Sequence, residues 1–310
     1  MGVFVFLPLV LPLSAWPVAR LAAPRLHPRT ATRLLAWFSA ALAVCSTLCL
    51  ALLMVVGTAQ LPGNPLPDAW SDPEVRAALP YDEIAGKAAI PALLVVLASC
   101  SRALWRHHRV RRRASRALAG LPGTSVVVLP DARPYAYALP GRRGRLVATT
   151  AMLAALSGPE RRALFAHERA HLDARHHRFL LTVQLAARAN PFLRPLRTAV
   201  AYTTERWADE EAATRIGSRR TVARAVGKAA LVSRGAPFPV LAGFAAAAGP
   251  VPRRVAALLA PAPAGRRWPS VFTLAGLATW GAAAGTAVSA LSSANSAVTL
   301  FRILKAATPL

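Results

Sequence analysis

Residues 164–173 read LFAHERAHLD and contain the pattern His-Glu-x-x-His at 167–171. Side chains four residues apart lie on the same face of an α-helix, so His167 and His171 can reach one metal ion together. Glu168 projects beside them, where its carboxylate can accept a proton from water and later pass it on. The pattern predicts a hydrolytic zinc site on a helix, because zinc accepts imidazole nitrogens, lowers the pKa of water and polarises a carbonyl group.

The start of this helix is marked by Ser-Gly-Pro-Glu at 157–160. Ser157 is a suitable N-cap, a proline follows in the first turn, and Glu160 comes three residues after the serine. Together they form a capping box, which predicts that the helix begins here and runs through the histidine pair.

A catalytic zinc ion needs a third protein ligand, and the segment TERWADEEA at 204–212 supplies a candidate. Glu205 lies in a predicted helix at 196–216 that can present its carboxylate to the histidines. Asp209, one turn further on, can accept a hydrogen bond from a ligand histidine; the alternative is a surface acid on a charged helix. Two histidines and a carboxylate suit Zn²⁺ best.

Long apolar runs predict membrane spans on both sides of this motif. Residues 34–56 and 268–301 carry no charge and are long enough to cross a bilayer as helices. Residues 84–105 carry a basic residue near each end, and both can reach the interface. Residues 2–18 are apolar but contain three prolines; a signal peptide is the competing interpretation, although no basic residue precedes the run. We therefore expect four spans.

Charge predicts the orientation of these spans. The chain is 55% hydrophobic and has a formal net charge of +25. The first loop holds four arginines, the second holds five acidic residues against one arginine, and 106–116 holds six arginines. The positive-inside rule therefore places the N-terminus outside and everything between the third and fourth spans in the cytoplasm. The excess charge alone would also fit nucleic-acid binding, but contact of 106–116 with anionic lipid headgroups is the simpler interpretation.

Between the third and fourth spans the apolar runs become short and periodic, as in a folded domain. We expect three short strands, at 125–129, 134–139 and 145–150. Besides the motif helix, we expect helices at 179–188, 196–216 and 220–233.

These segments resemble a known protein family. LFAHERAHLDARHH followed by ERWADEEAA resembles the membrane metallopeptidases of the BlaR/MecR type, peptidase family 56, and is more distantly similar to HtpX and the CAAX prenyl proteases of family 48. The similarity extends upstream through AYALPG and LVATTAMLAALSGPERRAL and downstream to RRVAALL, covering about 125–259. The resemblance implies that His167, His171 and Glu205 are zinc ligands, that Glu168 is the general base, and that Asp209 is the Asp of the family's ExxxD element.

The chain departs from the family pattern in two places. It has no Ser-x-x-Lys motif and little sequence after the last span, so we do not expect it to sense β-lactams directly. HtpX-like and CAAX-type enzymes often carry a histidine near the closing arginine segment, whereas this chain reads AGPVP at 248–252. The donor that stabilises the transition state is therefore unassigned, with Arg253 and Arg254 as candidates.

Some polar residues near the motif have less specific expectations. Tyr135 and Tyr137 alternate on a predicted edge strand, where they can contact an extended peptide or pack in the core. His176 and His177 are expected at an interface or on the surface and not as ligands. His107 and His108, in the basic run, are expected to have no specific role.

The expected fold is mainly α: multi-pass transmembrane helices plus a cytoplasmic, zincin-like α+β metallopeptidase domain with a small β-sheet. We expect a membrane domain at 1–105, the peptidase domain at 106–267, and a last span with a short tail at 268–310. The leading hypothesis is a zinc endopeptidase of the cell membrane that cuts a cytoplasmic or membrane-proximal protein. By resemblance its substrate is a transcriptional repressor; quality control of membrane proteins is the next choice.

The alternative is a non-catalytic membrane regulator that keeps this fold and binds a partner protein or anionic lipid. A membrane-tethered nucleic-acid binder rests on charge alone, so no nucleic-acid partner is expected. The expected partners are a protein or peptide substrate and the lipid bilayer, and the sequence sets no oligomeric state.

Overall fold

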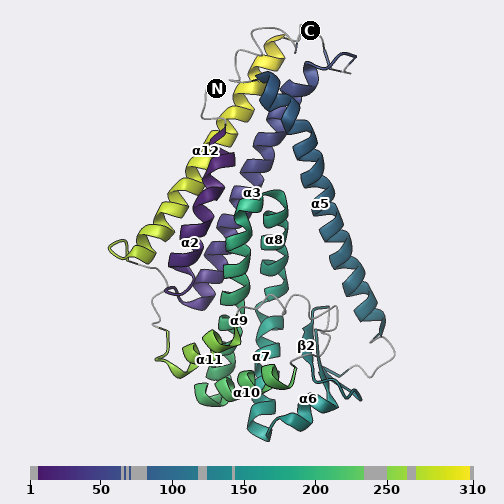
Figure 1. The fold of residues 1–310 in the computed structure, drawn as a ribbon, viewed down its shortest axis with the longest axis vertical. Coiled ribbons are helices and arrows are strands. Elements are labelled where there is room, and N and C mark those ends of the chain that lie inside the picture. Colours follow the sequence, from purple (N-terminus) through teal and green to yellow (C-terminus); the bar gives the residue numbers. More distant parts are fainter. Residues whose placement is uncertain are drawn as a thin grey trace.

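The structure is a computed structural model, and it describes residues 6–63, 66, 67, 70, 82–117, 124–141, 144–233, 250–263 and 270–307. Long helices form one end of the molecule, and a small sheet with shorter helices forms the other (Figure 1). The described part of the chain is therefore mainly α, with one three-stranded sheet.

Three helices are long and apolar enough to cross a membrane: α3 (Pro28–Ala59), α5 (Asp82–Ala117) and α12 (Leu274–Ala307). They contain or overlap the predicted spans at 34–56, 84–105 and 268–301. Helix α5 continues well past 105, because the arginine-rich run that follows has a high helix propensity. The beginning of the last predicted span, from Trp268, lies outside the described residues.

The first predicted span, 2–18, overlaps a shorter apolar helical stretch. This stretch consists of α1 (Leu7–Val10), the 3₁₀-helix η2 (Leu11–Ser14) and α2 (Ala15–Ala22). Its prolines each remove a backbone donor, which explains the mixture of short helical pieces. Residues 1–5 lie outside the described part, so this span remains a prediction.

The sheet contains β1 (Val126–Leu129), β2 (Ala136–Leu139) and β3 (Arg145–Thr149) in the order β1-β3-β2. Strand β3 pairs in parallel with β1 and antiparallel with β2. All three strands lie where the sequence predicts them. Among the described residues β2 pairs on one side only, so its other edge faces α7, whose Glu168 accepts a backbone hydrogen bond from Ala138.

The remaining described helices are α6 (Thr150–Ala155), α7 (Gly158–Asp173), α8 (His176–Ala189), α9 (Arg194–Ile216), α10 (Arg219–Val232) and α11 (Val251–Leu259), with a 3₁₀ turn, η4, at Pro191–Leu193. The predicted capping box is present at the start of α7, where Ser157 caps the helix and Glu160 reaches back to its backbone N–H. The helix that carries the motif thus begins where the sequence predicts.

Helices α8 and α9 rise between the long helices and pack against α3 (Figure 1). One core cluster joins apolar side chains from both groups, including Leu35 and Leu42 of α3 with Val183 of α8 and Leu196 and Val200 of α9. Burial of this shared apolar surface fixes the motif-bearing end of the molecule to the long helices.

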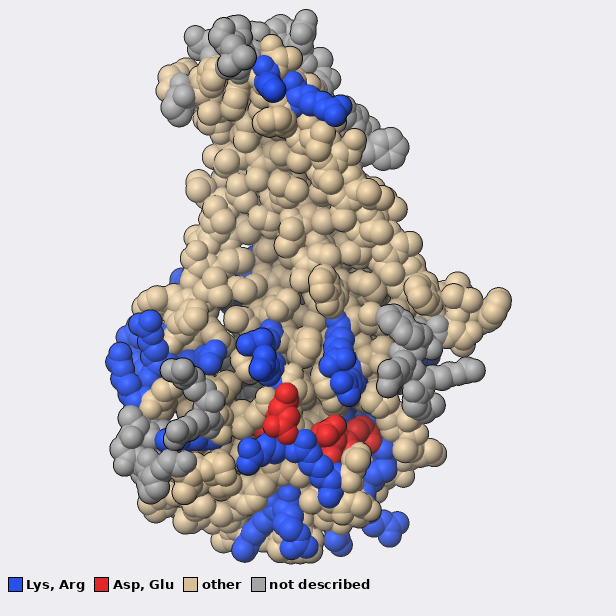
Figure 2. All heavy atoms as spheres, turned by 180° about the vertical axis from the view of Figure 1, so that it is seen from behind, with Lys and Arg blue, Asp and Glu red and all other residues tan. Residues whose placement is uncertain are grey.

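Charged side chains are distributed unevenly along the molecule. Figure 2 shows Lys and Arg gathered around the sheet end, below a band almost free of charge. Arg29 and Arg33, from the first loop and the start of α3, lie at this end, over the ring of Trp207 in α9. The acidic residues of the second loop at Asp68, Asp72 and Glu74 lie outside the described residues. The orientation of the chain in a membrane therefore remains a prediction.

Candidate metal centre

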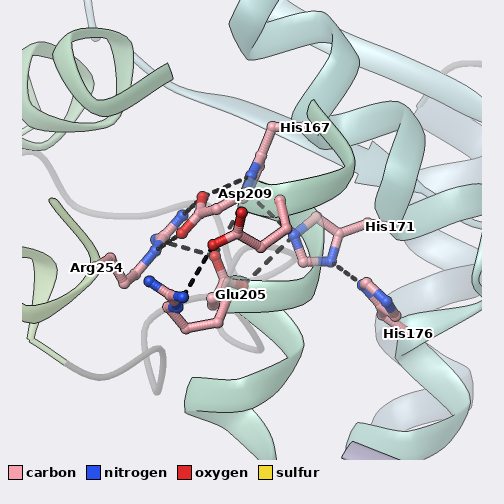
Figure 3. Close-up of polar contacts among 8 residues, drawn as sticks. His167, His171, His176, Glu205, Asp209 and Arg254 are labelled. Atoms are coloured by element: carbon pink, nitrogen blue, oxygen red, sulfur yellow. Dashed lines mark hydrogen bonds and ion pairs between the residues drawn. The ribbon is translucent and has the colours of Figure 1, made fainter. Parts of the chain in front are cut away.

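Three predicted ligands meet between α7 and α9. Nε2 of His167 lies 3.1 Å from Nε2 of His171. The Glu205 carboxylate faces both rings, with Oε2 3.4 Å from His167 Nε2 and Oε1 3.5 Å from His171 Nε2 (Figure 3). Spacing of four residues places the histidines on one face of α7, and α9 packs against that face.

This arrangement fits a zinc ion. One ligand atom from each of the three residues can be chosen so that all lie within 4.8 Å of one another. Two imidazole nitrogens and one carboxylate are a ligand set of catalytic zinc, which keeps a further position for water or substrate. His167 and Glu205 are buried. Burying polar side chains costs free energy unless they have a binding partner, and one metal ion could serve as that partner for all three residues.

Asp209 supports one of the ligands. Its Oδ1 lies 3.1 Å from Nδ1 of His167, on the side of the ring opposite Nε2. Its side chain is fully buried, so the alternative of a surface acid is wrong. A carboxylate on Nδ1 fixes the ring and leaves Nε2 for the metal.

Arg254, from α11, binds both acidic residues of the site. Its Nε and Nη2 donate to the two carboxylate oxygens of Asp209 at 2.9 and 2.6 Å, and Nη1 lies 3.0 Å from Oε2 of Glu205. Arg253, the other candidate donor, is exposed and lies over the ring of Tyr202. The structure thus separates the two arginines: Arg254 orders the acids, a role that the sequence pattern alone did not indicate.

Burial and charge set the protonation of the metal-free site. Burial lowers the pKa of His167, but Asp209 and Glu205 outweigh it and raise that pKa to about 10. Burial lowers the pKa of His171 to about 4. Burial also favours the neutral form of Glu205, yet Arg254 and His171 hold the pKa of Glu205 well below its usual range. Glu205 is therefore available as a carboxylate ligand.

Glu168 stands in a different environment on the same helix. Burial raises the pKa of its carboxyl, and a backbone hydrogen bond with Ala138 of β2 opposes this rise. A carboxyl group with a raised pKa is a better proton acceptor at neutral pH than an exposed one. This is the chemistry expected of a general base.

The site opens into two cavities. One, of about 120 Å³, lies among α5, β2, α7 and α8, and the other, of about 290 Å³, lies toward α10 and α11. His167, Glu168 and Glu205 line both. The second cavity is bounded mostly by small apolar side chains, among them Ala163, Val222, Ala225, Val226 and Ala229. The candidate reaction centre therefore lies between two hollows.

Of the two tyrosines expected to contact substrate, Tyr137 lies in β2 beside these hollows and Tyr135 directly precedes the strand. Tyr137 lines the first cavity and Tyr135 the second. Their rings stack with centroids 6.1 Å apart, and Tyr135 donates a hydrogen bond to Asp131. Strand β2 thus connects the two cavities.

The histidines outside the motif lie deeper than the sequence suggests. His176 is fully buried and contacts His171, so an expected place on the surface is wrong. His177 is half-buried and lines the first cavity together with the buried His107. The sequence marked His176 and His177 only by their position shortly after the motif, and His107 only by its place in the basic run that α5 contains.

Comparison with known proteins supports a metallopeptidase. The profile of peptidase family M48 matches residues 101–190, less than a third of the chain. The match covers the three strands and α6 to α8, including the histidine motif, but it ends before Glu205 and Arg254. Family M48 contains HtpX and the CAAX prenyl proteases, to which the residue patterns are more distantly similar than to the BlaR/MecR type. No curated protein and no solved structure matches the chain.

Proposed function

We propose that this chain is a membrane-embedded zinc endopeptidase. The observation that carries the proposal is the convergence of His167, His171 and Glu205 beside Glu168, between two cavities. The match to family M48, whose peptidases are typically zinc-dependent, supports the same chemistry. Three helices long enough to span a bilayer support the membrane location.

In this proposal each residue has one role. His167, His171 and Glu205 would hold the ion, which supplies a Lewis acid that polarises the scissile carbonyl and lowers the pKa of water. The Glu168 carboxylate takes a proton from the attacking water and gives it to the leaving amine. Asp209 holds the ring of His167.

The open edge of β2 suits a substrate in an extended conformation. A peptide can add to such an edge through main-chain hydrogen bonds, while side chains of the edge strand contact it alternately. Tyr137 of this strand and Tyr135, directly before it, line the two cavities and are the proposed contacts. This binding mode would bring the substrate beside Glu168, which accepts a backbone hydrogen bond from Ala138 of the same strand.

The proposed substrate is a cytoplasmic or membrane-proximal protein. The basic residues at the sheet end support a cytoplasmic position for the peptidase domain. Within metallopeptidases we place the chain nearest the BlaR/MecR type, on the segments that follow and precede the motif. A transcriptional repressor is then the first substrate to test, and damaged membrane proteins are the second.

The test compares wild-type protein with Glu168→Gln, both purified in detergent. We expect both to retain about one zinc per chain by mass spectrometry. Only the wild type should cleave labelled, unfolded casein. Zinc should be lost from His167→Ala and Glu205→Ala. Undiminished cleavage by Glu168→Gln would contradict the proposed mechanism.

One observation favours the non-catalytic alternative. Arg254, the candidate donor for the transition state that lies at the centre, is already bound by Asp209 and Glu205. A regulator that binds a partner protein or anionic lipid would retain zinc but cleave no protein. Zinc retention without cleavage in the wild type, with membrane proteins included among the substrates, would favour this alternative.

A further inference from the structure

His176 is the first residue of α8, and it lies directly against a proposed metal ligand. Its Nδ1 is 3.0 Å from Nδ1 of His171, and the two rings are nearly perpendicular (Figure 3). Arg175 makes this contact possible, since its left-handed backbone (φ 52°) turns the chain sharply between α7 and α8. The turn brings His176, the first residue of α8, back against α7.

The contact between two Nδ1 atoms requires that one donates and the other accepts. Nε2 of His171 faces Glu205 and the other ligand ring, so it must carry the lone pair when a metal is bound. The proton of His171 then sits on Nδ1, and His176 must accept it. If His176 donated instead, His171 would carry its proton on Nε2 and could not bind a metal.

Packing holds the ring of His176 in this orientation. Its side chain has no exposed surface, and its centroid lies 4.6 Å from the ring of Trp207. Trp207 is itself buried and contacts Phe179 as well as the guanidinium groups of Arg29 and Arg33. A ring fixed between Trp207 and His171 has little freedom to turn its acceptor away.

We propose that His176 is a positioning residue, which accepts a hydrogen bond from Nδ1 of His171 and thereby directs Nε2 toward the metal. The two ligand histidines are then supported differently, His167 by the carboxylate of Asp209 and His171 by a neutral imidazole. This inference rests on the proposed zinc site. It adds a residue that the histidine motif and the downstream acidic segment do not contain.

The test uses a matched pair of variants, His176→Asn and His176→Leu. Asparagine and leucine have side chains of the same shape, but only asparagine carries an acceptor, Oδ1, at the same number of bonds from Cβ as Nδ1 of histidine. Loss of a partner that orients a ligand typically weakens metal binding by about 10–100-fold. We therefore expect His176→Leu to lose about that much zinc affinity and His176→Asn to stay within about threefold of the wild type.

Zinc affinity is measured on the full chain in detergent by competition with a chromophoric chelator. The visible absorption of bound Co²⁺ provides a second measurement, because its bands report ligand geometry and should change in His176→Leu only. His108→Leu, which removes an exposed histidine of α5, is the control for histidine loss. Thermal unfolding of the metal-free variants shows whether the fold is retained.

The outcomes separate this inference from the proposed function. Zinc binding that is lost in His167→Ala but equally strong in His176→Leu and wild type would overturn the role of His176 and leave the peptidase proposal standing. Equal weakening in the leucine and asparagine variants would also overturn it, because the acceptor would then be irrelevant. A folded wild type that binds no zinc would overturn both.

Discussion

Arg254 and Asp209 form a buried, two-pronged ion pair, with Nη2 to Oδ1 at 2.6 Å and Nε to Oδ2 at 2.9 Å. The same guanidinium reaches Glu205, and the same carboxylate reaches His167. One arginine from α11 therefore orders a proposed metal ligand and the residue that supports another. The short helix α11 thus contributes to the candidate metal centre.

Replacing this arginine should destabilise the protein strongly. In Arg254→Gln the two acids remain buried without their partner, and removing one member of a buried pair costs about 3–5 kcal/mol. The melting temperature of the metal-free protein should fall clearly. Arg253→Gln, which removes an exposed neighbour, should leave it almost unchanged. Equal melting temperatures for the two variants would show that the buried pair does not stabilise the fold.

Zinc binding should release a proton from His167. In the metal-free site the pKa of His167 is raised to about 10, whereas that of His171 is lowered to about 4. At about pH 8, His167 is the one proposed ligand of the three that carries a proton to be displaced. Binding should therefore release about one proton per zinc. Zinc affinity should therefore rise as the pH increases toward about 10 and fall as it decreases.

Calorimetry in two buffers with different ionisation enthalpies counts this proton. Asp209→Asn removes one of the carboxylates that raise the pKa of His167, so this variant should release a smaller fraction of a proton at the same pH. Identical heats of zinc binding in both buffers would rule out the predicted protonation of His167.

The sequence predicted the parts of the site that depend on local geometry. A capping box fixes the start of α7, and helical spacing then places His167 and His171 on one face. Glu205 could be named because it lies in a second predicted helix that can present a carboxylate to the histidine pair. The three strands could be located because turn residues bound each of them.

The parts that were missed depend on contacts between distant segments. Arg254 is 45 residues from Asp209 along the chain, and nothing in its local pattern distinguishes it from Arg253. His176 was expected at an interface or the surface because the motif and Glu205 already supplied three ligands. Its burial follows from the left-handed turn at Arg175. A glycine, the usual residue in this conformation, would have indicated the turn, but an arginine does not. Such tertiary contacts have no periodicity that a single sequence reveals.

Glu160 should stabilise the fold in a pH-dependent way. Hydrogen bonds from Lys228 and Ser157 lower the pKa of its carboxyl from 4.5 to about 2. A carboxyl with a lowered pKa stabilises the folded state above 4.5, and this contribution is lost as the pH falls through about 2. At neutral pH Glu160→Gln should therefore cost about 1 kcal/mol, the usual value of a capping interaction.

Thermal unfolding at neutral pH and at about pH 2 measures this difference. Glu211→Gln is the control, because its side chain is partly exposed and, within the described part of the chain, pairs with Arg215 of the same helix. A stability difference between wild type and Glu160→Gln that persists unchanged at the acidic pH would contradict the assignment.

Close contact between α3 and α5 depends on two glycines. A Cβ built on Gly57 would overlap backbone atoms of Gly86, and a Cβ on Gly86 would overlap those of Gly57. Backbone atoms cannot rotate away as a side chain can, so Gly57→Ala must push the two long helices apart. Overpacking of this kind typically costs about 1–3 kcal/mol.

Gly281→Ala in α12 is the matched control, since nothing lies within 4 Å of the Cβ that it would add. Alanine restricts the unfolded chain and favours helix, so this variant should gain about 0.5–1 kcal/mol. The two substitutions are chemically identical, and their melting temperatures in the same detergent should shift in opposite directions. If Gly57→Ala instead raised the melting temperature as Gly281→Ala does, the helices would have to be separated at this point in the folded protein.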